Sequence, residues 1–368
     1  MKENFGNSDK WIARMPKVEL HRHLQGSIRT STIIDIAQRN KVDLPGFTAS
    51  RLDRYVKHKR PAKGLLEFLR PWAIFSRIIV NPETASRITY EAIEDAASDN
   101  IEYLELRFAP YTMSNNMKIG TRRLLEAIIA AINDAEKHFP IVVRLVLEIV
   151  RMDPIKYHNY NLQIIDVAHD YPDFVVGFDL AGDEANFPTG LYESFFKHVR
   201  EHGFKITVHA GEATGSESVR EAVELLYADR IGHGISALND SSVMQLLRSP
   251  PLQKRPIAIE ICPTSNFLTK TLPRNKIIPT IIQFLDYGVP VTIGSDSPQV
   301  CNTTLTDEFQ WLLDSELLST SQIISLFEIA IEYSFTSRQM KHKLSESLKN
   351  SIKKLDTQIH LSARGRTT

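Results

Sequence analysis

A (β/α)8 barrel with a helical cap inserted after its first strand is the fold class that this sequence predicts. Short runs of residues typical of buried strands alternate along the chain with segments of helical periodicity, which implies parallel strands joined by crossover helices. Eight such units are the number found in this barrel, whose active site lies at the C-terminal ends of the strands. The eight runs are residues 18–24, 101–108, 141–150, 174–180, 204–209, 230–235, 257–262 and 289–295.

Helical periodicity is clear in residues 83–99, 121–138 and 218–227. The segment from residue 30 to residue 99 is too long for one crossover, and its apolar stretch LLEFL at 65–69 has the composition of a helix. We therefore predict a helical cap over the barrel mouth between the first and second strands. A doubly wound open sheet would show a similar alternation, so the pattern alone leaves that fold as an alternative.

The domain prediction is one catalytic domain over residues 16–340. At 368 residues, the chain is also long enough for two ordinary domains, but no Gly/Ser-rich linker or internal repeat divides it. An extension over residues 1–15 precedes the domain. Residues 341–368 are polar and predict a surface helix that frays into a disordered tail.

Composition favours a small ligand over a polymer or a membrane. Lys and Arg together number 44, as do Asp and Glu, so no long-range field attracts nucleic acid or anionic lipid. No apolar run approaches the roughly 20 residues of a membrane span, and the first residues lack the apolar core of a signal peptide. Two cysteines, Cys262 and Cys301, do not make a disulfide framework. We expect a cytoplasmic protein, and the oligomeric state stays open.

The first predicted strand ends in His21-Arg22-His23. Residues two apart in a strand face the same side, so both imidazoles point into the barrel at its catalytic end. A pair of hydrogen-bonded core histidines would explain an isolated His-x-His equally well. Polar residues at other strand ends favour a binding site instead, namely His209 and Glu212 after the fifth strand, His233 in the sixth and Asp296 after the eighth.

Three imidazoles and one carboxylate suit zinc or another borderline divalent ion and leave one position for water. Such an ion lowers the pKa of its water from about 15.7 to roughly 7. Glu212 then has the chemistry of a general acid and base. His233 is suited to holding the hydroxide in line and offsetting charge as the tetrahedral intermediate forms.

Seven short segments that contain these polar residues or adjoin them occur in order along the chain: MPKVELHRHLQGSIR, YLELRFAP, GFDLAGDE, TVHAGE, RIGHG, EICPTSN and GSDSP. They resemble the motifs of the adenosine deaminase family, and the resemblance spans residues 16–332. It implies the barrel fold, hydrolytic deamination at C6 of a purine, and one Zn²⁺ per chain. The residues that match the family's zinc ligands are His21, His23, His209 and Asp296.

The resemblance also implies roles for three further residues. Glu212 matches the proton donor to ring nitrogen N1, and His233 matches the residue that orients the hydroxide. Gly182 matches a position whose backbone amide meets N3 of the purine. The first two roles agree with those inferred from residue chemistry alone.

Two substrate positions depart from the adenosine deaminase pattern. Gln25 stands where these enzymes have an Asp that helps hold the sugar; deaminases of N6-methyl-AMP carry Asn there, often followed by the GSIR found at residues 26–29. An amide still bonds a hydroxyl but does not repel a phosphate. Ser297 replaces the second Asp of a pair, which contacts N7, and a hydroxyl is able to donate there. Either the purine is held differently or the position has drifted.

The favoured function is therefore hydrolytic deamination of a 6-aminopurine nucleoside. One alternative is a deaminase of a modified nucleoside or nucleotide such as N6-methyl-AMP, and another is a barrel that binds nucleosides without catalysis. Ester or amide hydrolysis at a two-metal site would usually need a carbamylated lysine on a middle strand. The fourth predicted strand has none, and Lys205 begins the fifth rather than ending it.

Overall fold

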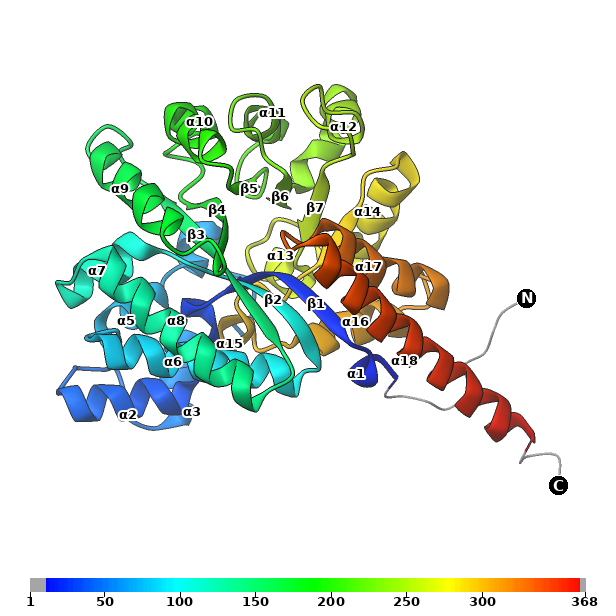
Figure 1. The fold of residues 1–368 in the computed structure, drawn as a ribbon, viewed down its shortest axis with the longest axis horizontal. Helices are drawn as coiled ribbons and strands as arrows, with labels where there is room; N and C mark the ends of the chain where they lie inside the picture. Colours follow the sequence, from blue (N-terminus) through cyan, green and yellow to red (C-terminus); the bar gives the residue numbers. More distant parts are fainter. Residues whose placement is uncertain (1–10, 365–368) are drawn as a thin grey trace.

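The computed structural model describes residues 11–364, which form a barrel of eight parallel strands surrounded by helices (Figure 1). The strands are hydrogen-bonded in sequence order, and a bridge between Arg22 and Asp296 joins the first edge to the last. They are β1 (Lys17–His23), β2 (Ile101–Phe108), β3 (Val142–Arg151), β4 (Val175–Gly182), β5 (Lys205–Ala210), β6 (Arg230–His233), β7 (Ala258–Ile261) and β8 (Val291–Ile293). The predicted (β/α)8 barrel is confirmed, and the open sheet is excluded.

The strands agree with the predicted runs, with differences at their ends. The second strand has the predicted bounds, whereas the sixth and eighth end two residues early. The backbone enters the left-handed region at His233, the last residue of β6, where φ is +62°, and again at Asp296 after β8, where φ is +61°. These turns end the strands and direct the following residues into the barrel mouth.

The helices form the outer ring of the barrel. The predicted segments 83–99 and 121–138 correspond to α6 (Pro82–Ser98) and α8 (Thr121–His138). The predicted segment 218–227 corresponds to α11 (Ser216–Glu224), which begins two residues earlier and ends three residues earlier. The helices are α1 (Trp11–Arg14), α2 (Thr30–Asn40), α3 (Ala49–Val56), α4 (Leu65–Phe68), α5 (Trp72–Ile78), α6 (Pro82–Ser98), α7 (Pro110–Met117), α8 (Thr121–His138), α9 (His158–His169), α10 (Glu193–Glu201), α11 (Ser216–Glu224), α12 (Ser241–Arg248), α13 (Pro263–Leu268), α14 (Arg274–Tyr287), α15 (Pro298–Cys301), α16 (Leu305–Asp314), α17 (Thr320–Tyr333) and α18 (Arg338–Arg364), with 3₁₀ turns η1 (Gln25–Ser27), η2 (Thr189–Tyr192) and η3 (Ile235–Asn239).

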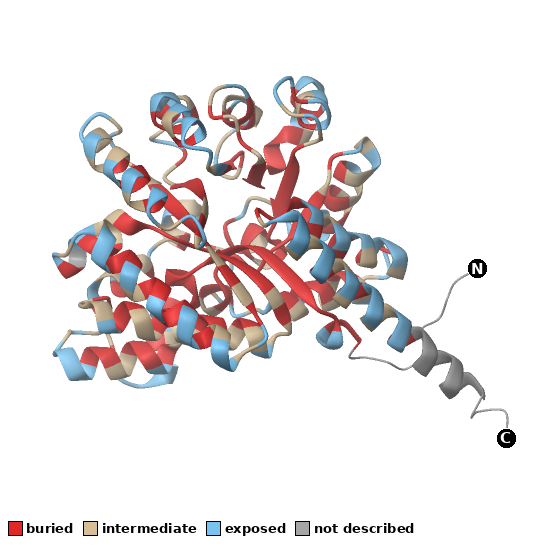
Figure 2. Cartoon of the chain, in the orientation of Figure 1, coloured by how far each residue is buried: buried red, intermediate tan, exposed pale blue. Residues whose placement is uncertain are grey.

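Sequence periodicity explains how these helices pack. In α8, Leu124, Ile128, Ile132 and Ala135 recur at spacings of three and four residues and are all buried. The α6 helix begins at a capping box, in which Asn81 and Thr84 bond each other's backbone amides. Figure 2 shows the result, with buried residues along the strands and on the inward helix faces and exposed residues outside.

The barrel interior contains paired charges as well as apolar side chains. Arg107 lies 2.8 Å from Asp179 and 2.9 Å from Glu260, and Arg230 bonds both Glu260 and Glu105 at 2.5 Å. All five side chains are fully buried. Unpaired ions there would cost several kcal/mol each, so every member of this network depends on its partners.

The segment that was predicted to be a polar surface helix and tail corresponds to α18, and one face of this helix is buried. Leu344, Leu348 and Leu355 of α18 are buried, at spacings that place them on one side of the helix. The predicted end of the tail at residues 365–368 and most of the extension at residues 1–15 lie outside the described residues, and the domain boundaries stay predictions. Within residues 11–364, no helix has both the length and the apolar composition to cross a membrane.

Candidate active site

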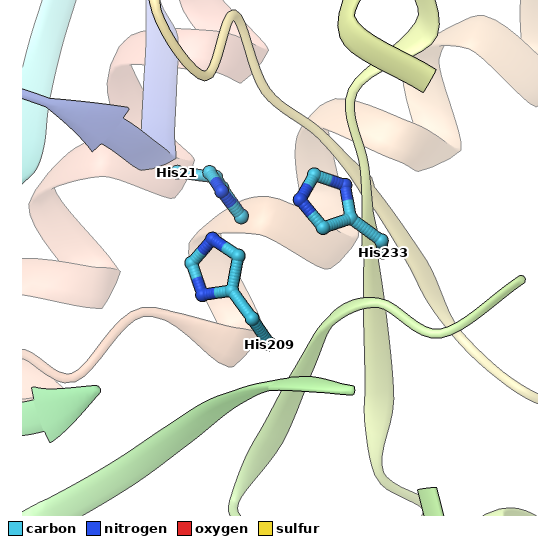
Figure 3. A group of neighbouring side chains, drawn as sticks. All are labelled: His21, His209 and His233. Atoms are coloured by element: carbon cyan, nitrogen blue, oxygen red, sulfur yellow. The ribbon is translucent and has the colours of Figure 1, made fainter. Parts of the chain in front are cut away.

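Four histidines meet at the C-terminal end of the barrel, as the sequence predicts. His21 and His23 come from β1, His209 from β5 and His233 from β6. The ring centre of His21 lies 4.7 Å from that of His209, 5.0 Å from that of His233 and 5.4 Å from that of His23. Figure 3 shows three of these rings converging on one point from different strands.

Asp296 completes the cluster from the turn after β8. One set of potential ligand atoms belongs to His21, His23 and Asp296, and another to His21, His209 and His233, with all atoms of a set within 4.8 Å of one another. A third set adds Cys262 to His233 and Asp296. Proximity alone therefore leaves the ligands of a metal ion undecided, and the hydrogen bonds of each ring have to distinguish them.

Each of three histidines has a carboxylate on its Nδ1 atom. His21 Nδ1 lies 2.7 Å from Glu260, and His23 Nδ1 lies 2.8 Å from Glu148. His209 Nδ1 lies 3.0 Å from Asp179. Each carboxylate oxygen accepts a hydrogen bond from Nδ1–H, so the proton of the neutral ring is on Nδ1 and the lone pair on Nε2 faces the shared centre.

The charge network keeps two of these carboxylates ionised. Burial by itself would raise the pKa of Glu260, but Arg107 and Arg230 lower it well below its usual range. Burial likewise opposes the effect of His209 and Arg107 on Asp179, whose pKa is also lowered. Anionic partners hold the rings of His21 and His209 in the orientation that a metal ligand needs.

The electrostatics of the rings also suit metal binding. Burial and the Arg107 guanidinium lower the pKa of His21 to about 3, so its ring is neutral. Its Nε2 atom is buried and has no hydrogen-bond partner among the described residues. Burial would lower the pKa of His23 too, but Glu148 and Asp296 raise it, so a proton and a cation compete for its Nε2. Three Nε2 atoms and Asp296 are a donor set that fits a borderline divalent ion.

His233 has a different environment. Its Nδ1 atom lies 3.0 Å from the side-chain amide nitrogen of Asn266 rather than from a carboxylate. Its Nε2 atom lies 3.5 Å from Glu212 Oε2 and 3.9 Å from Asp296 Oδ2. Burial and the neighbouring His21 and His209 lower its pKa well below the usual value, so the ring is neutral.

The environment of Glu212 favours the acid form of its carboxyl group. Burial, Asp296 and Glu184 together raise its pKa well above the usual value. The loop that carries it is fixed by Glu184, which accepts hydrogen bonds from the backbone amides of residues 211–214 at 2.6–3.2 Å and from the Ser218 hydroxyl at 2.6 Å. Four consecutive amides on one carboxylate make this a rigid loop.

A cavity of about 220 Å³ opens beside the cluster. His23, His209, Glu212, His233 and Asp296 line its polar side. Its apolar wall comes from the segment between β1 and β2 that was predicted to form a cap, with Leu65, Phe68, Leu69 and Trp72. No Lys or Arg belongs to the lining within residues 11–364.

Two of the three predicted substrate contacts line this cavity. Gln25 in η1 is 4% exposed, and Gly182 at the end of β4 has a φ of +107°, a conformation that favours glycine. Both therefore lie where a ligand in the cavity would meet them.

Ser297 lies elsewhere. Its hydroxyl donates to Asp296 Oδ1 at 2.9 Å, the side chain is fully buried, and it does not belong to the described cavity lining. A Cβ atom built on Gly26 would come within 2.3 Å of Ser297 Oγ, so η1 packs directly against this residue. The predicted contact with N7 of a purine stays untested, whereas the contact with Asp296 is already made.

Comparison with known proteins decides the family. The family model described as adenosine deaminase matches residues 16–351. The adenosine deaminase of Clostridium botulinum (strain Hall) is 36% identical over 347 residues, which are 92% of this chain and 98% of the relative. This chain belongs to the adenosine deaminase family. It is a hydrolytic deaminase, as its sequence predicts.

Solved structures of relatives include enzymes with different substrates. The apo N6-methyl-AMP deaminase from Arabidopsis thaliana is 26% identical, with a TM-score of 0.79 over 93% of this chain and 98% of that one. A related Arabidopsis structure in complex with GMP is 25% identical, with a TM-score of 0.80 over 93% of this chain and 98% of that one. The adenine deaminase from Arthrobacter aurescens has a TM-score of 0.82 at 22% identity over 92% of this chain and 99% of that one, which shows the shared fold. Family membership therefore establishes hydrolytic deamination as the reaction type, whereas these relatives differ in their substrates.

Several residues around the site carried no predicted role. The carboxylates behind the histidines, Glu148, Asp179 and Glu260, each interrupt an otherwise apolar strand segment, as in FVVGFDLAG. A charge inside such a strand costs free energy unless it is paired, so each of these was a detectable signal. Glu184 and Asn266 lie within the motifs GFDLAGDE and EICPTSN, but their residue types gave no comparable signal of a role, because acidic and amide residues are ordinary in loops and at helix starts.

Proposed function

We propose that this enzyme is a zinc-dependent aminohydrolase of an uncharged 6-aminopurine nucleoside, producing the 6-oxo purine nucleoside and ammonia. The observation that carries the proposal is one cavity that combines a metal-type donor set, a Glu212 carboxyl whose acid form is favoured and a lining without Lys or Arg among the described residues. Water is the second substrate, and its oxygen replaces the amino nitrogen at C6.

Under this proposal, the ligands of one Zn²⁺ are His21, His23, His209 and Asp296. The carboxylates on the Nδ1 atoms of the three histidines support this choice over the set that contains His233. When bound, such an ion supplies the Lewis acidity that makes water a nucleophile at neutral pH. The carboxylates of Glu260, Glu148 and Asp179, which bond the Nδ1 atoms, hold the three imidazole rings with Nε2 directed toward the metal position.

The remaining residues bind the purine and move protons. Glu212 donates its proton to N1, which draws electrons from C6 and favours attack there. His233 faces both Glu212 and Asp296 and is suited to orienting the attacking water. The backbone amide of Gly182 donates a hydrogen bond to N3 of the purine, and the side-chain amide of Gln25 is suited to hydrogen-bonding a sugar hydroxyl. We also propose that α4 and α5, whose side chains form the apolar wall, act as the predicted cap.

The charge of the cavity supports a nucleoside over a nucleotide. Phosphate recognition usually employs Arg or Lys, and the described lining has neither, whereas it contains the acidic side chains of Glu148, Glu212 and Asp296. The adjoining groove does contain Lys63 and Arg70 and shares Leu65 with the cavity. Arg70 lies 3.6 Å from Glu67, so part of its charge is already compensated.

A nucleotide such as N6-methyl-AMP is the second candidate substrate. It is favoured by the 26% identity with the Arabidopsis N6-methyl-AMP deaminase and by the cations of the adjoining groove. If these cations bind a 5′-phosphate, Lys63→Ala and Arg70→Ala should lower kcat/KM for the nucleotide and leave that for adenosine unchanged.

Ammonia release from a substrate panel tests the proposal. The panel contains adenosine, deoxyadenosine, adenine, AMP and N6-methyl-AMP, with zinc content measured on the same samples. We expect kcat/KM for adenosine to exceed that for AMP by about 100-fold or more, the effect of about 3 kcal/mol. A preference for N6-methyl-AMP would select the second candidate. Binding of nucleosides without turnover of any panel member would contradict catalysis and select the binding barrel.

We also propose a cytoplasmic location. Cys262 and Cys301 are both buried free thiols, which supports this location because thiols persist in a reducing compartment.

A further inference from the structure

Asn266 is a buried residue that connects the backbone after β7 to His233. It lies in α13 and has no exposed surface. Its Oδ1 atom accepts a hydrogen bond from the backbone amide of Cys262 at 3.2 Å, and its Nδ2 atom lies 3.0 Å from His233 Nδ1. Both ends of the side-chain amide are therefore occupied.

The backbone amide of Cys262 determines which way this side chain faces. A backbone N–H only donates, so the atom of Asn266 that meets it has to be the oxygen. Exchanging the oxygen and nitrogen would place two donors against each other at Cys262. The amide nitrogen must consequently face His233 Nδ1.

The orientation of Asn266 in turn determines where His233 holds its proton. An amide nitrogen offers N–H groups and no lone pair for a hydrogen bond, so His233 Nδ1 has to accept. A neutral imidazole has one N–H, which is then on Nε2. That atom faces two acceptors, Glu212 at 3.5 Å and Asp296 at 3.9 Å, which agrees with a proton at this position.

The other three histidines have the opposite arrangement. His21, His23 and His209 face carboxylates with Nδ1 and therefore direct a lone pair from Nε2 into the site. His233 belongs by distance to the same group of potential ligands as His21 and His209. The identity of the Nδ1 partner, amide or carboxylate, is what separates His233 from them.

We propose that Asn266 is a positioning residue that holds His233 in the Nε2–H tautomer, and so excludes it from the metal ligands and reserves it as a hydrogen-bond donor. The inference rests on the proposed function for what His233 does in the reaction. The tautomer itself depends only on the hydrogen bonds of Cys262, Asn266 and His233. An Nε2 that carries a proton has no lone pair for a metal ion but donates to an attacking oxygen or to Glu212.

The first measurement is the tautomer of His233 in the zinc-loaded protein. Ring 15N–1H correlation spectra of 15N-histidine-labelled protein distinguish Nδ1–H from Nε2–H, and the His233 signals are identified by their loss in His233→Gln. We expect Nε2–H for His233 and Nδ1–H for His21, His23 and His209. An Nδ1–H pattern for His233 would overturn the proposal, whatever the enzyme's activity.

The decisive variant is Asn266→Asp, which keeps the shape of the side chain. One carboxylate oxygen still accepts from Cys262, while the other faces His233 Nδ1 and should move the ring proton to Nδ1. Reversing the tautomer of a catalytic histidine lowers kcat by about 10⁴-fold in serine proteases. We expect a loss of about 10²- to 10⁴-fold in kcat, KM within about threefold, and an unchanged zinc content.

Two further variants keep the test decisive. Asn161→Asp makes the same chemical change at another buried helical Asn, in α9, and should leave both the His233 signals and kcat unchanged.

If Asn266→Asp does not fold, Asn266→Ala removes the donor and should give a mixture of both tautomers, with kcat reduced about 10- to 100-fold. A reversed tautomer with kcat within fivefold of wild type would refute the catalytic part of the inference, as would full activity of Asn266→Ala. Absence of turnover in wild type would contradict the proposed function and leave the spectral test intact.

Discussion

The hydroxyl of Ser297 donates a hydrogen bond to Oδ1 of Asp296 at 2.9 Å, between two side chains that are both buried. Burial would raise the pKa of Asp296, but His23 and His21 lower it, so the carboxylate is an anion that benefits from a donor. In this chain the residue after the proposed ligand thus supports that ligand.

Changing Ser297 to Asp should therefore impair the site. The new carboxylate would adjoin Asp296 and crowd Gly26, so we expect weaker zinc binding and a loss of about 1–3 kcal/mol in the free energy of unfolding. Ser297→Asn, of similar size and uncharged, separates crowding from charge. Zinc content and thermal denaturation measure both effects. A rise in kcat/KM for adenosine with Ser297→Asp would instead favour direct contact with the purine.

Gln25→Asp tests the sugar end of the cavity. A carboxylate at this buried, cavity-lining position should repel a phosphate, so kcat/KM for AMP and N6-methyl-AMP should fall about tenfold or more relative to adenosine. Gln25→Asn provides the uncharged control of the same length as Asp. Equal changes for phosphorylated and unphosphorylated substrates would place the sugar elsewhere.

Glu212→Gln should separate proton donation from metal binding. The variant lacks the acidic proton but none of the proposed ligands, so we expect unchanged zinc and a kcat reduced by about 10²- to 10⁴-fold. Because its raised pKa favours the acid form of Glu212 that donates the proton, wild-type kcat/KM should fall as the pH rises through that pKa. The variant should lack this decline. Near-normal turnover in the variant would reject the role.

Glu308 gives a prediction about stability and pH. Burial raises its pKa to about 7, above the value of an unfolded chain, so the folded protein holds a proton that the unfolded chain loses near pH 4.5. Stability should consequently decrease as the pH rises from about 4.5 to about 7 and change no further above that range. Glu308→Gln removes the ionisable group and should be more stable than wild type by up to about 3 kcal/mol at pH 8, with no difference near pH 4.5. Denaturant titrations of wild type and Glu308→Gln between about pH 4.5 and pH 8 test this prediction. A difference in the free energy of unfolding that does not depend on pH would contradict it.

The hydrophobic periodicity of the sequence correctly predicted those features that are determined within a single segment of the chain. The bounds of β2, the helix at α8 and the common face of His21 and His23 follow from local patterns. The pairing of Asp179 with His209 and of Asn266 with His233 depends on how neighbouring strands and loops meet, which no single segment contains. Ser297 shows the same limit, because its direction depends on the left-handed turn at Asp296 and on the approach of Gly26.

The buried network of Arg107, Asp179 and Glu260 bears on when a metal ion can bind during folding. Arg107 on β2 bonds Asp179 on β4 and Glu260 on β7, and these two hold histidines that come from β5 and β1. The candidate ligands are separated by up to the whole interval from residue 21 to residue 296, so none of the site exists as a local unit. Under the proposed ligand set, a ribosome-bound chain that has not yet exposed residue 296 lacks one of the four ligands. We therefore expect metal loading to follow barrel closure, and a chain truncated before β8 to bind the metal weakly.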